Sequence, residues 1–120
     1  MHNFHYQHGS LYCERVPLEQ IAGEHGTPCY VYSAATILRH YRVVDEAFAM
    51  VPHLIAFAMK ANSNLAILRL LALEGSGADI VSGGELFRAV KAGIPPQKIV
   101  FAGVGKSREE IRYALQSDIL

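Results

Sequence analysis

The sequence LIAFAMKANSN at residues 54–64 decides how the rest of this chain is interpreted. Its first part, Leu54–Met59, is entirely apolar, and Lys60 follows directly. An apolar run of this length is too short to cross a membrane and is typical of a buried β-strand. Asn62–Asn64 holds residue types that cap the start of helices. The segment therefore predicts a strand that leads into a helix, and Leu65, Leu68 and Leu71 give that helix its apolar face.

A second strand–helix pair follows. Ala78–Val81 predicts a strand, Gly83–Gly84 a tight turn and Glu85–Ala92 a helix that Gly93 ends. Gly75 and Gly77, which precede this strand, are interpreted as the break after the previous helix.

A third pair has the same form. Ile99–Ala102 predicts a strand, and Ser107–Glu110 is an S-x-x-E capping box that opens a helix. We expect Ile111, Ala114 and Leu115 to face inward from that helix. Asp118–Leu120 has the pattern of a further strand's first residues.

The spacing of these units indicates the fold class. The predicted strands begin near residues 54, 78, 99 and 119, so each unit is about 20–24 residues long. Alternating strands and helices imply parallel strands joined by right-handed crossovers, in an α/β barrel or an open doubly wound sheet. A closed barrel needs about 200 residues or more. Since only about three units are visible, we expect a truncated piece of a larger protein.

The residues before position 54 predict a different pattern. We expect an extended start, a turn at residues 8–10, a short helix over Leu18–His25 and a strand over Cys29–Tyr32. Ser33 is a good N-cap for a longer helix that Pro52 would end. Its apolar stripe predicts packing on another apolar surface and consists of Ile37, Tyr41, Val44, Phe48 and Val51.

The composition is that of a globular protein and argues against several classes of partner. Of the 120 residues 51% are hydrophobic, and eleven basic residues balance eleven acidic ones. Nucleic acid and anionic membranes are therefore not expected partners. The start of the sequence shows no secretory signal, and two cysteines do not make a disulfide framework. We expect reduced thiols in a cytoplasm.

Two motifs suggest binding sites that we do not favour. Gly103–Ser107 follows a strand and opens a helix, as a nucleotide-binding loop does, but Val100 occupies the position that such a loop reserves for its first glycine. A glycine turn and a helix cap explain these residues more simply. His2, His5 and His8 recur every three residues but lack a nearby Cys, Asp or Glu, so no metal site is predicted.

Lys60 and Asp79 are the candidate site residues. A lysine at the point where a buried strand leaves the core needs water, a counter-ion or a covalent partner for its ammonium. Partial desolvation lowers a lysine's pKa, and the neutral amine is the form that attacks carbonyl groups. Asp79 lies within a predicted strand next to that of Lys60, where a carboxylate needs a cation or hydrogen-bond donors.

Four segments share their residues and their order with a known family. They are Gly26–Tyr32, Phe57–Asn64, Gly77–Leu86 and Ile99–Ser107. Together they resemble the barrel-type (fold type III) amino-acid decarboxylases, which use pyridoxal 5′-phosphate. Met59 stands where a valine is commoner in that family, a packing change that leaves the chemistry intact.

The resemblance implies the first part of a pyridoxal-phosphate-binding (β/α)8 barrel, truncated after about three units. It implies that Lys60 carries the cofactor covalently and that Asp79 lies beside it. Ser82 and Glu85 match the family as well, although turn and helix-cap roles suffice for them. Residues 33–120 would belong to the barrel, and residues 1–32 would associate with a β-rich second domain.

The resemblance also implies an activity. It is greatest to the bacterial branch that decarboxylates meso-2,6-diaminopimelate to L-lysine, as a homodimer. A related decarboxylase of ornithine, arginine or carboxynorspermidine remains open, as does a non-catalytic piece that binds only cofactor or a partner. We expect these 120 residues alone to be inactive.

Overall fold

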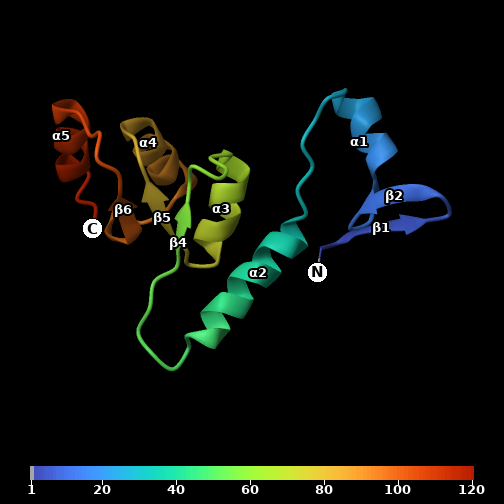
Figure 1. Cartoon of the computed structure of the whole chain (residues 1–120), viewed down its shortest axis with the longest axis horizontal. Helices are drawn as coiled ribbons and strands as arrows, with labels where there is room; N and C mark the ends of the chain where they lie inside the picture. Colours follow the sequence, from blue (N-terminus) through green and yellow to red (C-terminus); the bar gives the residue numbers. More distant parts are fainter. Residues whose placement is uncertain (1) are drawn as a thin grey trace. The chain divides into compact units, whose positions relative to one another are not determined.

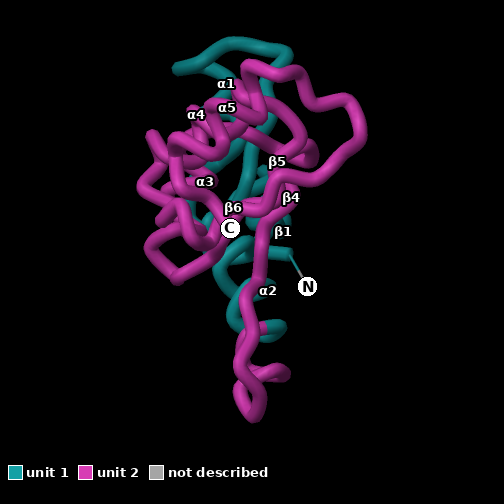
Figure 2. The backbone as a smooth tube through the Cα atoms, turned by 90° about the vertical axis from the view of Figure 1, so that its left-hand side faces the viewer, with its two compact units in different colours: residues 1–44 teal, residues 45–120 magenta. Residues whose placement is uncertain are grey.

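Three parallel strands form the sheet that the sequence predicts. The structure, a computed structural model, describes residues 2–120 and divides after Val44 into two units (Figure 2). In the second unit, β4 (Ala56–Ala58), β5 (Gly77–Ile80) and β6 (Ile99–Phe101) pair in that order. Both pairings are parallel (Figure 1), which confirms the α/β class.

A helix follows each strand, as predicted. The three helices are α3 (Leu65–Leu73), α4 (Gly83–Ala92) and α5 (Arg108–Gln116). A short 3-10 helix, η1 (Pro96–Lys98), precedes β6. Asn64 and Ser107 cap α3 and α5 with their side chains, and Ser107 forms the predicted capping box.

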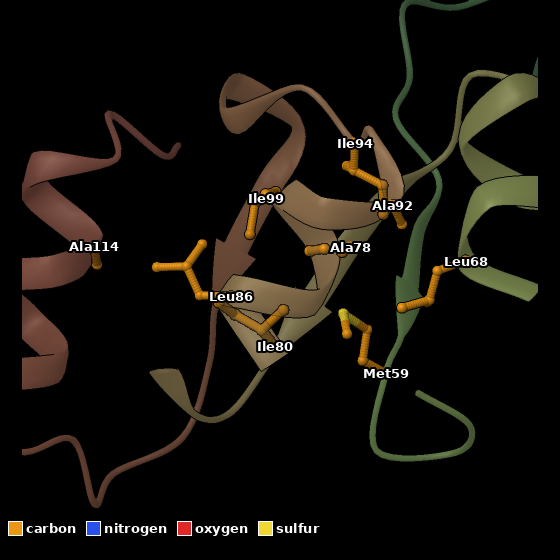
Figure 3. Packing of buried hydrophobic residues seen from close by; sticks show 10 residues of the cluster. Met59, Leu68, Ala78, Ile80, Leu86, Ala92, Ile94, Ile99 and Ala114 are labelled. Atoms are coloured by element: carbon orange, nitrogen blue, oxygen red, sulfur yellow. The ribbon is translucent and has the colours of Figure 1, made fainter. Parts of the chain in front are cut away.

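The core of this unit lies between the sheet and its helices (Figure 3). Its fully buried members include Met59, Leu68, Ile80, Leu86 and Ile99. Burying a side chain of this size contributes about 1.5–3 kcal/mol. Because side chains alternate along a strand, Ala78 and Ile80 face the helices, and Asp79 between them faces the opposite side of the sheet.

Gly77 is required where β5 passes close to the chain before β6. A Cβ atom at this position would collide with the Lys98 carbonyl oxygen and would lie 3.2 Å from the Lys98 Cβ. Backbone atoms in a paired strand have little room to move. The glycine therefore permits the close approach of these two segments.

Several predicted boundaries in this unit were wrong. Gly83 and Gly84 are not a turn but the first residues of α4, because the Ser82 side chain accepts a hydrogen bond from the Glu85 amide and caps the helix. The strands are also shorter than predicted at positions 54–59 and 99–102, and β5 begins and ends one residue earlier.

The end of the chain differs from the prediction too. Ala114 is buried, but Ile111 is 44% and Leu115 77% exposed, since the described residues provide no surface against them. Residues 118–120 are not a strand, although the Leu120 amide donates to the Ile99 carbonyl at 3.1 Å.

The first unit begins with a small antiparallel sheet. Its strands are β1 (Phe4–Gln7), β2 (Ser10–Cys13) and β3 (Val16–Pro17). They are followed by α1 (Leu18–His25) and by α2 (Ala34–Ala47), whose residues after Val44 belong to the second unit. Glu14 accepts hydrogen bonds from the Ser33 hydroxyl at 2.7 Å and from the Ala35 amide at 2.8 Å. The hydrogen bond from Ala35 and, to a smaller extent, that from Ser33 hold the pKa of Glu14 below its ordinary value. They join the sheet to the start of α2.

Two predictions in this region were wrong. Cys29–Tyr32 is not a strand, because neither described sheet pairs with it, and Tyr30 is 90% exposed. Ser33 does cap α2, with its hydroxyl accepting from the Thr36 amide at 3.0 Å. However, α2 ends at Ala47, before Val51, and none of its residues is buried. The apolar stripe is therefore not buried among residues 2–120.

Candidate active site

Lys60 lies at the carboxyl end of β4, in the loop that leads to α3. The Met59 amide continues the sheet by donating to the Asp79 carbonyl at 3.0 Å, and the Met59 side chain is buried in the core. The Ala61 amide donates to the Ala58 carbonyl at 3.1 Å and closes a turn around Lys60. Lys60 itself is exposed. A buried residue therefore anchors the backbone directly before an accessible amine.

Lys60 is also a lysine without an internal partner. The sequence has four lysines. Lys98 donates to the Gly75 carbonyl at 2.8 Å, and Lys106 donates to the Gly103 carbonyl at 2.6 Å. Lys60 and Lys91 make no hydrogen bond or ion pair among residues 2–120. Of these two, Lys60 is the one placed at a strand's carboxyl end.

Asp79 lies on the face of the sheet that the helices do not cover. In the register of the strands it is paired with Ala58 on β4 and Val100 on β6. Ala58 and Gly77 leave little side-chain volume on this face. The Asp79 Oδ1 atom is buried, and no donor in the described part of the chain reaches it. The pairing of β4 with β5 confirms that the strands of Lys60 and Asp79 are neighbours.

The unsatisfied Asp79 oxygen is informative about ligands. A buried carboxylate oxygen without a partner costs about 1–3 kcal/mol, or more when charged. A ligand with a hydrogen-bond donor or a positive charge would remove that cost. Pyridoxal phosphate carries hydrogen-bonding and positively charged groups that could meet this need, so Lys60 and Asp79 fit that cofactor.

The loop after Lys60 is held at several points. Asn62 Oδ1 accepts from the Asn64 amide at 3.0 Å, and Asn64 Oδ1 accepts from the Ala66 amide at 2.9 Å. The Arg88 guanidinium on α4 donates to the Ser63 carbonyl at 3.1 Å. Sequence reasoning predicted the asparagine caps but not Arg88, which is 25 positions from Ser63 and belongs to no motif.

Carboxylates occupy the start of α4. Glu85 Oε2 accepts from the Val81 amide at 2.7 Å, and Glu110 Oε1 accepts from the Gly83 amide at 2.9 Å. The other Glu110 oxygen accepts from the Ser107 amide at 2.9 Å. The hydrogen bond from Ser107, and next that from Gly83, hold the pKa of Glu110 below its ordinary value. Glu85 thus has the cap role that the sequence suggested.

The Gly103–Ser107 loop is a turn and a cap, as interpreted from the sequence. Gly103 has φ of 86°, and Ser107 is the N-cap of α5. The Lys106 Nζ lies 5.0 Å from the centre of the Phe101 ring, in addition to its bond with Gly103. A cavity of about 350 Å³ is lined by Lys106 of this loop together with residues of β6, α5 and positions 118–120. Neither Lys60 nor Asp79 lines it.

His2 and His5, near the amino terminus, interact with residues of the same small sheet. His2 Nδ1 accepts from the Phe4 amide at 3.2 Å, and His5 stacks on Tyr12 with ring centres 5.8 Å apart. Within residues 2–120, no three His, Cys, Asp or Glu side chains are grouped as metal ligands. No helix in the same range is long and apolar enough to span a membrane.

Comparison with known proteins reveals a family match over most of the chain. The model for the pyridoxal-dependent decarboxylase, pyridoxal binding domain, matches residues 34–120. Diaminopimelate decarboxylase of Haemophilus influenzae is 53% identical over 116 residues, which are 97% of this chain and 28% of that protein. The Vibrio cholerae enzyme of the same name is 52% identical over 120 residues, 99% of this chain and 29% of its own.

The solved structures that resemble this chain include members of the same family. Diaminopimelate decarboxylase from M. jannaschii in complex with L-lysine superposes with a TM-score of 0.93 at 39% identity, over 98% of this chain and 28% of that one. This chain thus spans less than a third of the length of the proteins that it matches. What it matches is the first part of a cofactor-binding barrel, which is not complete in these residues.

Proposed function

The chain belongs to the pyridoxal-dependent decarboxylase family, and we propose that it forms part of an enzyme that converts meso-2,6-diaminopimelate to L-lysine and carbon dioxide. The observation that carries this proposal is the position of Lys60, an accessible amine beside a strand with an unsatisfied buried carboxylate. Barrels of this kind hold their active sites at the carboxyl ends of the strands.

Lys60 would hold pyridoxal phosphate covalently through its Nζ atom. When bound, the cofactor supplies a ring that takes up the electron pair left behind as the carboxylate departs as carbon dioxide. Once substrate has displaced it, the Lys60 amine is free to move a proton onto the substrate carbon. Its exposed side chain, on a backbone anchored by the buried Met59, suits both roles.

Asp79 would bind the same cofactor through Oδ1. Its carboxylate is held by the central strand of the sheet, so its orientation does not depend on a flexible loop. A carboxylate beside a cationic group favours the charged form of that group. Asp79 would therefore lie beside the cofactor, favour a positive charge on it and help to hold it in place.

The choice of substrate rests on the degree of similarity. The diaminopimelate decarboxylases match at about 50% identity over nearly the whole chain. Lysine/ornithine decarboxylases from Vibrio vulnificus match at 23–24% identity, which supports a common fold only. A related decarboxylase of a basic amino acid is the second candidate, and a piece that binds cofactor or a partner without catalysis is the third.

The proposal includes the setting of the enzyme. Residues 33–120 would belong to the barrel, and residues 1–32, of which Met1 lies outside the described part, would associate with a β-rich second domain. We expect a cytoplasmic homodimer that binds neither nucleic acid nor membrane. The balanced charge and the unpaired cysteines, Cys13 and Cys29, support this setting.

Two measurements on the full-length enzyme test the proposal. The first compares carbon dioxide release from meso-diaminopimelate with that from ornithine, arginine and carboxynorspermidine. The second reduces the lysine–cofactor bond with borohydride and maps the labelled peptide. We expect L-lysine as product and a label on Lys60. Preference for another substrate would refute the assigned activity, and a label on Lys91, Lys98 or Lys106 would refute the assigned site.

A further inference from the structure

Arg88 reaches from α4 to the loop that carries Lys60. Its Nη1 atom donates a hydrogen bond of 3.1 Å to the Ser63 carbonyl. The first residues of the loop are fixed by the Ala58–Ala61 turn, and Asn64 joins its last residues to α3. Arg88 adds a bond to a different helix, one that begins directly after the strand of Asp79.

The base of the Arg88 side chain is rigid. Leu86, two positions before it, and Ala89, directly after it, are both fully buried in the core. The start of α4 is further held by Ser82 and by Glu110. A guanidinium that projects from so fixed a backbone limits where the Ser63 carbonyl can lie.

We propose that Arg88 is a positioning residue for Lys60, holding the 59–64 loop in a fixed place relative to the strand of Asp79. This inference rests on the proposed function. Arg88 does not touch the reacting atoms; it acts through the backbone of the loop. An arginine guanidinium presents several donors in one plane, which suits it to hold a backbone carbonyl.

The expected effect is a loss of rate more than of affinity. Misplacing a reacting group by about 1 Å can lower a rate by about 100-fold. Arg88 is exposed, and the loop keeps its asparagine bonds without it. We therefore expect Arg88→Met to lower kcat by about tenfold, with KM for diaminopimelate changed less than about threefold. Arg88→Lys, which keeps the charge and a donor, should recover part of the loss.

The experiment uses the full-length enzyme and four proteins: wild type, Arg88→Met, Arg88→Lys and Arg69→Met. Arg69 is an exposed arginine of α3 that forms no hydrogen bond in the described residues, so its substitution controls for loss of charge. Kinetics are measured together with amide hydrogen exchange of the cofactor-free proteins. The exchange readout does not depend on activity.

We expect Arg88→Met to exchange faster in peptides that cover residues 59–64, with peptides of β5 and α4 unchanged. Arg88→Lys should be intermediate and Arg69→Met like wild type. Unchanged exchange in that loop, or a rate loss equal in the Arg69 and Arg88 variants, would overturn the inference. If Arg88→Met unfolds, the Arg88→Lys comparison decides in the same way.

Failure of the proposed function would give a different result from failure of the inference about Arg88. Wild-type enzyme would then release no carbon dioxide from diaminopimelate or would carry its label on another lysine. The exchange comparison would still report whether Arg88 holds the loop.

Discussion

Replacing Gly77 by alanine should lower the stability of the protein, whereas replacing Gly23 by alanine should not. At Gly77 the added methyl would collide with the Lys98 carbonyl oxygen and would lie 3.2 Å from the Lys98 Cβ, closer than the roughly 3.5–4.0 Å of a favourable carbon contact. Neither side can easily yield, because β5 pairs with β4 on one side and β6 on the other. Overpacking of this kind costs about 1–3 kcal/mol.

Gly23 is the matched control. It lies within α1, and nothing is within 4 Å of the position of an added Cβ. Alanine is more favourable than glycine inside a helix by about 0.5–1 kcal/mol. In the full-length enzyme, chemical denaturation should thus show a lower unfolding free energy for Gly77→Ala and an equal or higher one for Gly23→Ala. Equal losses for both variants would contradict the packing argument.

Four further predictions concern the site and its surroundings. Asp79→Asn should weaken cofactor binding at least about tenfold in a spectroscopic titration, because a charge-assisted hydrogen bond contributes about 1.5–3 kcal/mol; unchanged affinity would remove Asp79 from the site. Lys106→Ala should leave cofactor binding unchanged, and no saturable ATP binding should be measured, since that amine bonds to its own loop. The pKa of His53, measured by NMR, should lie above its ordinary value, because the Val51 carbonyl and, next, the Asp45 carboxylate accept hydrogen bonds from its ring. The stability that the protonated ring contributes is complete at low pH and is lost as the pH rises through the raised pKa. An ordinary pKa for His53 would refute this prediction. A polypeptide of only these 120 residues should release no carbon dioxide from diaminopimelate, and measurable turnover would show the expectation wrong.

The sequence was most informative where structure is decided locally. The caps at Asn64 and Ser107 depend on residues only a few positions apart, so the local pattern predicted them, and the strand–helix order followed from the succession of such patterns. The Gly83–Gly84 error arose because glycine suggests a turn, whereas Ser82 and the distant Glu110 provide enough hydrogen bonds to start a helix there.

Errors and omissions elsewhere have a common physical origin. A strand exists only when another pairs with it, so the β-forming residues Cys29–Tyr32 could not by themselves decide their structure. In the site, the neighbouring strands of Lys60 and Asp79 were predictable from the unit spacing. The bond from Arg88 to Ser63 joins residues far apart in sequence, and no local pattern encodes it.

The bond between Glu110 and Gly83 has a consequence for biosynthesis. The carboxylate that completes the start of α4 is encoded 27 residues after the amide that it accepts from. At a synthesis rate of about 5–20 residues per second, Glu110 is added to the chain about 1–5 s after Gly83. The helix can form before then on Ser82 and Glu85, but the Gly83 amide gains this acceptor only when the next unit has left the ribosome. The second strand–helix unit thus gains part of its stability only after the third has been synthesised.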